Sequence, residues 1–472
     1  MLGIADVGVR AQGFSELGPV APMQVARYGH MATPLDDGKV LVAGGHTQGF
    51  ALTATAEIYD PALDTWTLYN VPNPHDGGAM VRLSDGRYLF MGGASSGSGV
   101  GQSSVTTLYD PVSDSFTNGP PMLYSRFFQT AAVLASGDVL VVGNWYAPGT
   151  AELYDHSSGT FVPVGMPIER SSPLILPCAD GTAYIVGGSS IYGSGNFTEV
   201  EAFDPATGQF ALVASEMVPG EQGWSTYWSS YMNRIDLMQR TNGHYVFLVY
   251  RVVAGEYEYG IAEFDPVAKQ FSLLPLDPAL PIYTGTTAGP WAYAVTLMLD
   301  QARDLVHVSA VDLVDPLHAE RMHTVDVPTG FVSLATGGVV FGRYLYSGSR
   351  AWIGDAILFT GGTVDGSNFN VSNEANLLLP QHTVSIGSPE EPVEVPFAYP
   401  DPMGPDGGWV HLRGKGQRLL RLIDQTGRIC REIGVGPSEE MVRIERAGLP
   451  AGMYTIELTG PQYRSTCRVV LE

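Results

Sequence analysis

Arginine and aromatic side chains recur in the polar loops of this 472-residue sequence. The guanidinium fork of arginine suits carboxylate or hydroxyl-rich ligands, and aromatic faces stack on sugar rings or on peptide side chains. The candidate ligand-binding residues are Arg27, His46, His75, Arg126, Trp145, Tyr146, Arg170, Tyr192, Trp224, Trp228, Tyr283, Trp291 and Arg350. Whether they form one site depends on the elements that carry them.

Short hairpins repeat along the chain. The first is TATAEIYDPALDTWT, in which Trp66 follows Tyr59 by seven positions and an Asp-Pro turn lies between them. The same spacing recurs at Tyr109 and Phe116, Tyr154 and Phe161, Phe203 and Phe210, and Phe264 and Phe271. Asp and Pro favour a tight turn, and the flanking residues suit half-buried strands. Each hairpin is too small to bury its own apolar face, so we expect it to pack against a neighbouring sheet.

An apolar run ending in paired glycines precedes each hairpin. Examples are DGKVLVAGG at 37–45, DGRYLFMGG at 85–93 and DGTAYIVGG at 180–188, with SGDVLVVGN at 136–144 and GDAILFTGG at 354–362 as variants. A continuous apolar run bounded by turn residues predicts a strand buried on both faces. Paired glycines indicate crowded backbones or positive φ angles.

The repeat spacing predicts the architecture. The hairpin aspartates Asp60, Asp110, Asp155, Asp204 and Asp265 are 50, 45, 49 and 61 residues apart. A period near 50 with four strands per unit is typical of propeller blades. The double glycine and the two aromatics resemble the kelch family in four repeats and partly in a fifth, where Val249 and Tyr250 replace the glycines. The resemblance implies an all-β, kelch-type β-propeller of seven blades, with six as the alternative.

The last blade lacks a closing strand after EANLLLP, and the segment 11–20 resembles the end of a blade. We therefore expect the propeller to span residues 12–380 and an N-terminal strand to close it, which removes exposed sheet edges. In kelch-type rings the ligand surface is built by loops that lead into the first strand of each blade and leave the second. The resemblance therefore gathers the candidate residues around one mouth. The alternative is that the arginines pair with loop carboxylates and the aromatics pack the tops of the blades.

A proline- and glutamate-rich linker is expected at 381–406, followed by a small β-sandwich at 407–472. The C-terminal region resembles the sorting domain of proteins exported by the type IX secretion system of Bacteroidota. The matching residues are Tyr399, Pro400, Asp401, Pro402, Gly427, Leu449, Pro450, Gly452 and Tyr454. The terminal Cys467-Arg468 and Glu472 depart from that family's lysine-bearing tail. The resemblance implies contact with the secretion machinery and a secreted or outer-membrane-surface location; an ordinary immunoglobulin-like module is the alternative.

The first eleven residues are interpreted as the remnant of a signal peptide, because their apolar part is too short for a complete one. No uninterrupted apolar run is long enough to span a membrane. The net charge of −23 argues against a nucleic-acid partner, because the field repels phosphate. Without a C-x-x-C motif no zinc site is expected, although Cys430 and Cys467 could pair across two strands. No cofactor or metal is predicted.

Three kinds of function remain open, and no motif names a reaction, so the sequence leans away from an enzyme. The first is a surface or secreted module that binds a glycan or protein ligand, or an extracellular scaffold. The second is a polysaccharide lyase, with His75, Arg126, Tyr146 and Arg170 cast as base and carboxylate-neutralising groups. The third is a copper-radical oxidase of the galactose-oxidase type, which the sequence disfavours because it lacks an adjacent Tyr-His pair and Cys178 directly precedes a turn.

Overall fold

The structure is a computed structural model. It describes residues 13–96, 101–144, 149–165, 167–189, 197–226, 238–254, 256–277, 279–280, 296–311, 320–334, 349–354, 356–363, 370–381, 397–399, 408–411, 418–424, 428–436, 441–446, 448–459 and 464–471. The chain divides into two compact units, Ala11–Thr383 and a second composed of Met1–Arg10 with Val384–Glu472. Each unit is considered by itself.

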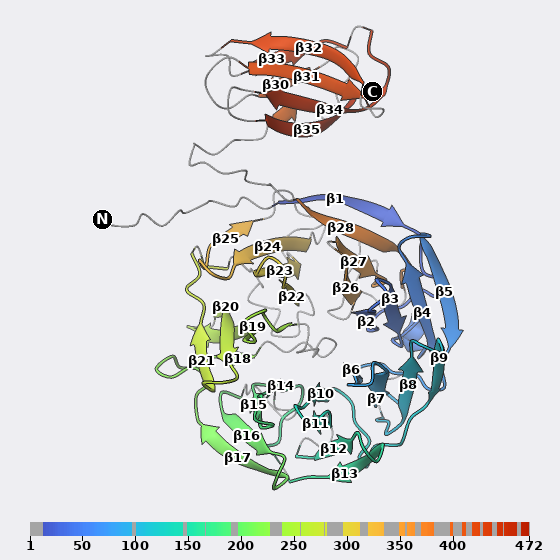
Figure 1. Cartoon of the computed structure of the whole chain (residues 1–472), viewed down its shortest axis with the longest axis vertical. Helices are drawn as coiled ribbons and strands as arrows, with labels where there is room; N and C mark the ends of the chain where they lie inside the picture. The colour runs from blue at the N-terminus through green and yellow to red at the C-terminus, as the bar shows by residue number, and fades with distance from the viewer. Residues whose placement is uncertain are drawn as a thin grey trace. The chain divides into compact units, whose positions relative to one another are not determined.

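The larger unit consists of four-stranded antiparallel sheets placed around a common centre (Figure 1). Seven such sheets lie within the described residues. Six of them use four consecutive strands each, and the first two are β2 (Met31–Pro34), β3 (Val40–Ala43), β4 (Thr55–Asp60) and β5 (Thr65–Asn70), and β6 (Ala79–Arg82), β7 (Tyr88–Met91), β8 (Thr106–Asp110) and β9 (Ser115–Asn118). The third and fourth are β10 (Thr130–Val133), β11 (Val139–Val142), β12 (Ala151–Asp155) and β13 (Thr160–Pro163), and β14 (Leu174–Pro177), β15 (Ala183–Val186), β16 (Val200–Asp204) and β17 (Gln209–Ala214). The fifth and sixth are β18 (Ser225–Thr226), β19 (Tyr245–Val253), β20 (Glu256–Asp265) and β21 (Gln270–Leu273), and β22 (Thr296–Asp300), β23 (Leu305–Val311), β24 (Glu320–Asp326) and β25 (Val332–Leu334).

The remaining sheet of this unit combines the two ends of its chain. Its strands are β26 (Arg350–Ile353), β27 (Ala356–Thr360), β28 (Ala375–Gln381) and β1 (Gly13–Val20), in the order β1-β28-β27-β26. β1 pairs with β28 along its whole length, from Gly13 opposite Gln381 to Val20 opposite Ala375, with a register shift between Ser15 and Leu17. The side chain of Trp66 also reaches the residue after β1, because its indole N–H donates to the Ala21 carbonyl at 2.6 Å.

The apolar runs before the paired glycines form the second strand of their sheets, as predicted. Every residue of β3, β7 and β11 is buried. A strand buried along its whole length has both faces covered, which explains why these segments are continuous in apolar character rather than alternating. At the end of β3, Gly44 and Gly45 have φ angles of 71° and 88°. A Cβ at Gly45 would lie within 3 Å of the His30 nitrogen, so backbone crowding also requires glycine there.

The seven-residue aromatic spacing places two rings opposite each other across each hairpin. Tyr59 pairs in register with Trp66, and their ring centroids are 4.9 Å apart. The corresponding distances are 4.6 Å for Tyr109–Phe116, 5.2 Å for Tyr154–Phe161, 4.9 Å for Phe203–Phe210 and 4.5 Å for Phe264–Phe271. Such pairs add about 0.5–1.5 kcal/mol each beyond their buried area. The Asp60 carboxylate accepts the Ala62 amide at 2.9 Å and so forms the expected turn.

Apolar clusters join each sheet to the next. One cluster contains Leu41 and Ile58 from the β2–β5 sheet with Phe90 and Tyr109 from the β6–β9 sheet. Further clusters connect the following sheets in the same way. The β26–β28 sheet shares one cluster with β22 and β24 and another with β2, β3, β4 and β5. Each sheet therefore buries both of its faces against neighbours, which is the packing of a β-propeller.

The smaller unit contains two antiparallel sheets. One consists of β29 (Phe397–Tyr399), β30 (Gly408–His411) and β33 (Met441–Ile444), and the other of β32 (Ile429–Val435), β31 (Arg418–Asp424), β34 (Gly452–Thr459) and β35 (Arg464–Leu471) in that order. Residues of both sheets share one apolar core, among them Val410, Ile444, Leu420 and Ile456. Cys430 is a free thiol on β32, and two strands separate β32 from β35, which carries Cys467. The suggested disulfide is therefore absent.

The structure has no α-helix in the ranges that it describes, and η1 (Gln48–Phe50) is a short 3₁₀ turn. Accordingly, none of the described helical residues forms a stretch long and apolar enough to cross a membrane.

Candidate functional site

The candidate residues belong to one end of the propeller sheets. Because the strands are antiparallel, the loop that leads into the first strand of a sheet and the loop that leaves its second strand lie at the same end. We call this the mouth end. The opposite end, where the hairpin turns lie, is called the turn end.

Arg27, which precedes β2 at the mouth end, is buried and paired with Glu57 of β4. Its Nη2 lies 2.9 Å from Glu57 Oε1, and neither side chain is exposed. Its Nη1 donates to the carbonyls of Gly44 and Thr55, both at 3.0 Å. The Glu57 carboxylate also accepts the backbone amide of Val25 at 3.0 Å. The pair therefore fixes the incoming loop to the second and third strands of its sheet.

The same arrangement recurs in two further sheets. Arg126 Nε lies 2.6 Å from Glu152 of β12, and Arg170 Nη2 lies 3.0 Å from Glu201 of β16. Each arginine again donates Nη1 to the carbonyl of the glycine that ends the second strand, Gly143 at 2.8 Å and Gly187 at 3.0 Å. Burial lowers the pKa of Arg27, Arg126 and Arg170, and the attraction of the paired glutamate raises it in part. These buried guanidinium groups fix each incoming loop to the second and third strands of its own sheet.

His75 takes the place of the arginine in the β6–β9 sheet. Its Nδ1 lies 2.8 Å from the Gly92 carbonyl and its Nε2 lies 2.9 Å from the Thr107 hydroxyl, at the position where the three arginine-bearing sheets have glutamate. A carbonyl can only accept, so Nδ1 carries the proton and Nε2 accepts from the hydroxyl. Burial lowers the pKa of His75 to about 4. With both nitrogens engaged, this imidazole is a structural group.

Two further described candidates, Arg350 and Trp224, are also buried against groups of the protein. Arg350 on β26 is buried and donates to the Thr296 hydroxyl at 3.0 Å. Trp224 is buried beneath the guanidinium of Arg251, whose carbon lies 4.5 Å from the ring centroid. Arg27, Arg126 and Arg170 thus pair with carboxylates, as in the alternative, although these glutamates lie on third strands rather than in loops. Trp224 packs into the sheets. Predicted residues outside the described ranges are Trp145, Tyr146, Tyr192, Trp228, Tyr283 and Trp291.

His46 differs from the other candidates because it lies against a carboxylate of the next sheet. It follows the paired glycines of β3, and its Nδ1 lies 3.0 Å from Oδ1 of Asp76, which precedes β6. The exposed fractions of the two side chains are 8% and 1%. The ring of His46 is stacked on Tyr28, with centroids 5.2 Å apart, and is nearly perpendicular to the ring of Phe50, with centroids 6.3 Å apart. Burial raises the pKa of Asp76, and its contact with His46 opposes that shift.

Backbone hydrogen bonds hold this pair in position. The amide of Gly45 donates to the His75 carbonyl at 3.1 Å, and the amide of Ala94 donates to the Asp76 carbonyl at 2.8 Å. His46 Nε2 and Asp76 Oδ2 have no hydrogen-bond partner among the described residues. The pair therefore offers an unpartnered nitrogen and an unpartnered oxygen, which is a combination that can orient a hydroxyl group or move a proton.

The sequence did not single out Asp76. Its signal is its position in the repeat: Tyr28, Asp76, Phe127 and Ser171 each directly follow the buried arginine or histidine of their sheet. The next residue in each loop is left-handed, with φ of 65° at Gly29, 60° at Gly77, 57° at Phe128 and 48° at Ser172. Two of these four are not glycine, so the mouth end stores backbone strain of about 1 kcal/mol or more at each.

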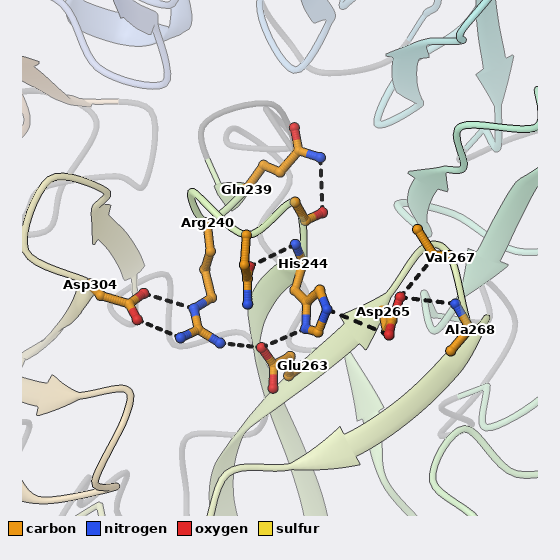
Figure 2. A network of polar contacts seen from close by, with 10 residues as sticks. Gln239, Arg240, His244, Glu263, Asp265, Val267, Ala268 and Asp304 are labelled. Carbon is orange, nitrogen blue, oxygen red and sulfur yellow. Dashed lines mark hydrogen bonds and ion pairs between the residues drawn. The ribbon is translucent and has the colours of Figure 1, made fainter.

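A second polar cluster lies at the turn end and joins two neighbouring sheets (Figure 2). Arg240 donates Nε to Asp304 at 2.7 Å and also contacts Glu263. His244 places Nδ1 at 3.0 Å from Glu263 and Nε2 at 3.5 Å from Asp265. The hydrogen bond to Asp304 is the main cause that raises the pKa of Arg240. This network fastens the β18–β21 sheet to the β22–β25 sheet.

The residues present do not fit a copper-radical centre in the described part of the chain. Cys178 is buried in the β14–β15 turn, with its sulfur 3.9 Å from the Leu176 carbonyl. The group of His, Cys, Asp or Glu side chains that the described residues bring close enough for a metal is Asp138, Asp155 and His156. It lies in hairpin turns, away from the mouth end.

Together, the repeated sheets and a sequence match fit a kelch-type β-propeller. The match is to beta-scruin, a kelch-repeat protein of Limulus polyphemus, at 26% identity over 196 residues. It covers 39% of this chain and 21% of beta-scruin, so the chain spans about a fifth of that relative's length. No protein-family model matches the chain.

Among solved structures, the chain is similar to a fungal alcohol oxidase of the AA5 family in complex with copper. The TM-score is 0.54 at 14% identity, over 97% of this chain and 99% of the other. At this identity the likeness shows the fold alone.

The buried ion pairs predict a large, site-specific loss of stability. Replacement of Glu57 by Gln leaves the Arg27 charge buried without its counter-ion, and should lower the free energy of unfolding by about 3 kcal/mol. The matched control is Glu221→Gln, which removes the partly exposed contact to Arg251 and should cost less than about 1 kcal/mol. Urea unfolding measures both. Equal losses for the two variants would contradict the structural role of the Arg27–Glu57 pair.

The low pKa of His75 predicts a pH dependence of stability. An unfolded histidine has a pKa of about 6.5, so the unfolded chain gains the proton first as the pH falls. The stability that neutral His75 contributes is complete above about pH 6.5 and is lost toward pH 4, a change of roughly 3 kcal/mol. The difference in unfolding free energy between the native chain and His75→Gln should therefore shrink over this range. If the unfolding free energies of the native chain and His75→Gln changed with pH in parallel, His75 would not titrate in this way.

Proposed function

We propose that this chain is a propeller-type interaction protein that binds a glycan or a protein through the mouth end of a seven-bladed ring. The seven four-stranded sheets and the pairing of β1 with β28 support a ring that the N-terminal strand closes. The match to a kelch-repeat protein supports an interaction role. If the bound partner is another surface protein, the chain acts as an extracellular scaffold.

The observation that carries the proposal is the way in which the mouth loops are built. Arg126 anchors its loop from below through Glu152, while the residues just before it, Leu123 and Tyr124, are 49% and 39% exposed. The guanidinium carbon of Arg126 lies 5.3 Å from the centre of the Tyr124 ring. A fixed loop that presents apolar and aromatic side chains to solvent loses little conformational entropy on binding. This is the character of a recognition surface.

The lyase alternative receives no support from the described candidates. His75, Arg126 and Arg170 are buried and engaged with protein groups, and Tyr146 lies outside the described residues. A lyase would need one of these side chains at the surface to receive a proton or a carboxylate.

A double variant tests the binding surface. Leu123→Ser with Tyr124→Ser should weaken binding of the full chain at least tenfold, because it removes the exposed apolar contacts of one mouth loop. Binding is measured on a glycan array and on immobilised bacterial cell-surface proteins. The control is Val112→Ser, which alters a 95% exposed valine in a hairpin at the turn end. If the control weakens binding as much as the double variant does, or if the double variant binds normally, the ligand does not use this surface.

The smaller unit is proposed to act as a type IX sorting domain, which implies export to the outer-membrane surface or the medium. Its own apolar core supports an independent module. Of the matching residues, Leu449 and Tyr454 are buried, and the Tyr454 hydroxyl donates to the Pro450 carbonyl at 2.9 Å. Gly452 begins β34 with a φ of 151°. The side chain of Tyr399 is not described, and Pro400, Asp401, Pro402 and Gly427 lie outside the described residues.

A reporter carrying a signal peptide tests this role. When residues 384–472 are fused behind it, the reporter should reach the medium or cell surface of a bacterium that has type IX secretion. The same reporter without these residues should remain in the periplasm. Tyr454→Ala should reduce export severalfold, because it removes a buried ring and its bond to Pro450, whereas Cys430→Ser should not. Periplasmic retention of the intact fusion would contradict the assignment.

A further inference from the structure

The His46–Asp76 pair is polar, buried and incompletely bonded. Buried polar atoms in proteins nearly always have a hydrogen-bond partner, and each exception needs an explanation. Here all four polar side-chain atoms of His46 and Asp76 lack a hydrogen bond among the described residues, with Nδ1 and Oδ1 meeting as an ion-pair contact at 3.0 Å. They are at the mouth end, between the sheets that begin with β2 and β6. An unmet acceptor beside an imidazole nitrogen indicates a place for a ligand group that both donates and accepts.

A hydroxyl group satisfies that requirement. Its hydrogen can be donated to Asp76 Oδ2 while its oxygen accepts from His46 Nε2–H, provided that a second proton is held between His46 Nδ1 and Asp76 Oδ1. A ligand carboxylate would be repelled by Asp76, and Arg27, Arg126 and Arg170 are already paired with glutamates. A ligand ammonium would need to lose its hydration in a site that is almost fully enclosed, which costs far more than burial of a neutral hydroxyl. The net charge of −23 also disfavours an acidic ligand.

We propose that His46 and Asp76 form a subsite for a hydroxyl of a neutral saccharide, which binds at the mouth end beside the aromatic residues Tyr28 and Phe50. The inference rests on the proposed binding function and specifies its ligand. Tyr28 supports the imidazole by stacking, and Phe50, which is 40% exposed, offers an aromatic surface next to it. Aromatic surface beside hydrogen-bonding groups is the combination that holds a sugar ring.

The segment η1 lies against this subsite. The ring of Phe50, at the end of η1, is nearly perpendicular to the His46 ring. Gly49 and Phe50 both have left-handed backbones, with φ of 70° and 64°, and such strain in a non-glycine residue persists only where the surroundings enforce it. The neighbouring Thr47 amide is held by the Ala51 carbonyl at 2.7 Å. A ligand hydroxyl reaches Asp76 when this short segment moves aside.

The experiment uses the full chain on an array of neutral and uronate-containing glycans. Asp76→Asn keeps the shape of the side chain but replaces the unpartnered acceptor, and His46→Gln replaces the imidazole. Each should weaken binding to neutral glycans at least tenfold. The matched control is Ser189→Ala, which occupies the position of His46 in the β14–β17 sheet, where Ser189 contacts Ser171 at 3.0 Å. Thermal unfolding of all variants establishes that they are folded, and His46→Gln carries the test if Asp76→Asn is not.

The outcomes separate this inference from the function on which it rests. Loss of neutral-glycan binding in both variants with retention in the control supports the subsite, and slower hydrogen exchange at 47–52 on glycan binding supports the role of η1. Normal binding by Asp76→Asn and His46→Gln overturns the subsite but leaves the mouth surface intact. Selective binding of uronates, or capture of a protein through Leu123 and Tyr124 without glycan binding, overturns the saccharide inference and preserves the proposed function. A native chain that binds neither glycans nor surface proteins contradicts both proposals.

Discussion

Every sheet of the propeller unit has two apolar faces, and neither face can be left in water. The second strands of the sheets show this most clearly, since Val40, Val42, Leu140 and Val142 are wholly buried. A two-faced sheet needs a neighbour on each side, and a series of such sheets meets that need when it curves into a ring. Burial of apolar area contributes about 25 cal/mol per Å², so this packing dominates the stability of the unit. The mouth loops are positioned by the sheets that carry them.

The same packing explains why the repeated arginines are structural. The third strand of each sheet is covered on both faces, so Glu57, Glu152 and Glu201 are buried although they alternate with apolar residues. A buried carboxylate is costly unless it is paired, and the incoming loop supplies the arginine. The charges of each arginine and its glutamate therefore neutralise each other inside the protein and are not available to a ligand. What remains to face a ligand is the loop surface above these pairs, where Tyr124 is exposed.

The fold could be read from the sequence to a large extent because its signals are local. The seven-residue interval between Tyr59 and Trp66 fixes the hairpin register, and an apolar run such as Val40–Ala43 fixes a doubly covered strand. The site could not be read in the same way. Arg27 appeared in a polar loop, and nothing nearby revealed Glu57, which lies 30 positions further along. His46 and Asp76 belong to different sheets, so their meeting depends on how neighbours pack, which no single repeat encodes.

The pairing of β1 with β28 bears on how the protein is made. A ribosome releases β1 first and β28 only after nearly the whole unit has been synthesised. Domains fold progressively from the N-terminal side as the chain emerges, so the intermediate sheets can assemble while β1 still lacks its partner. Contacts between residues so distant in sequence form slowly. β1 therefore stays without its strand partner until β28 has been synthesised, so a chain that stops before β28 cannot complete this sheet.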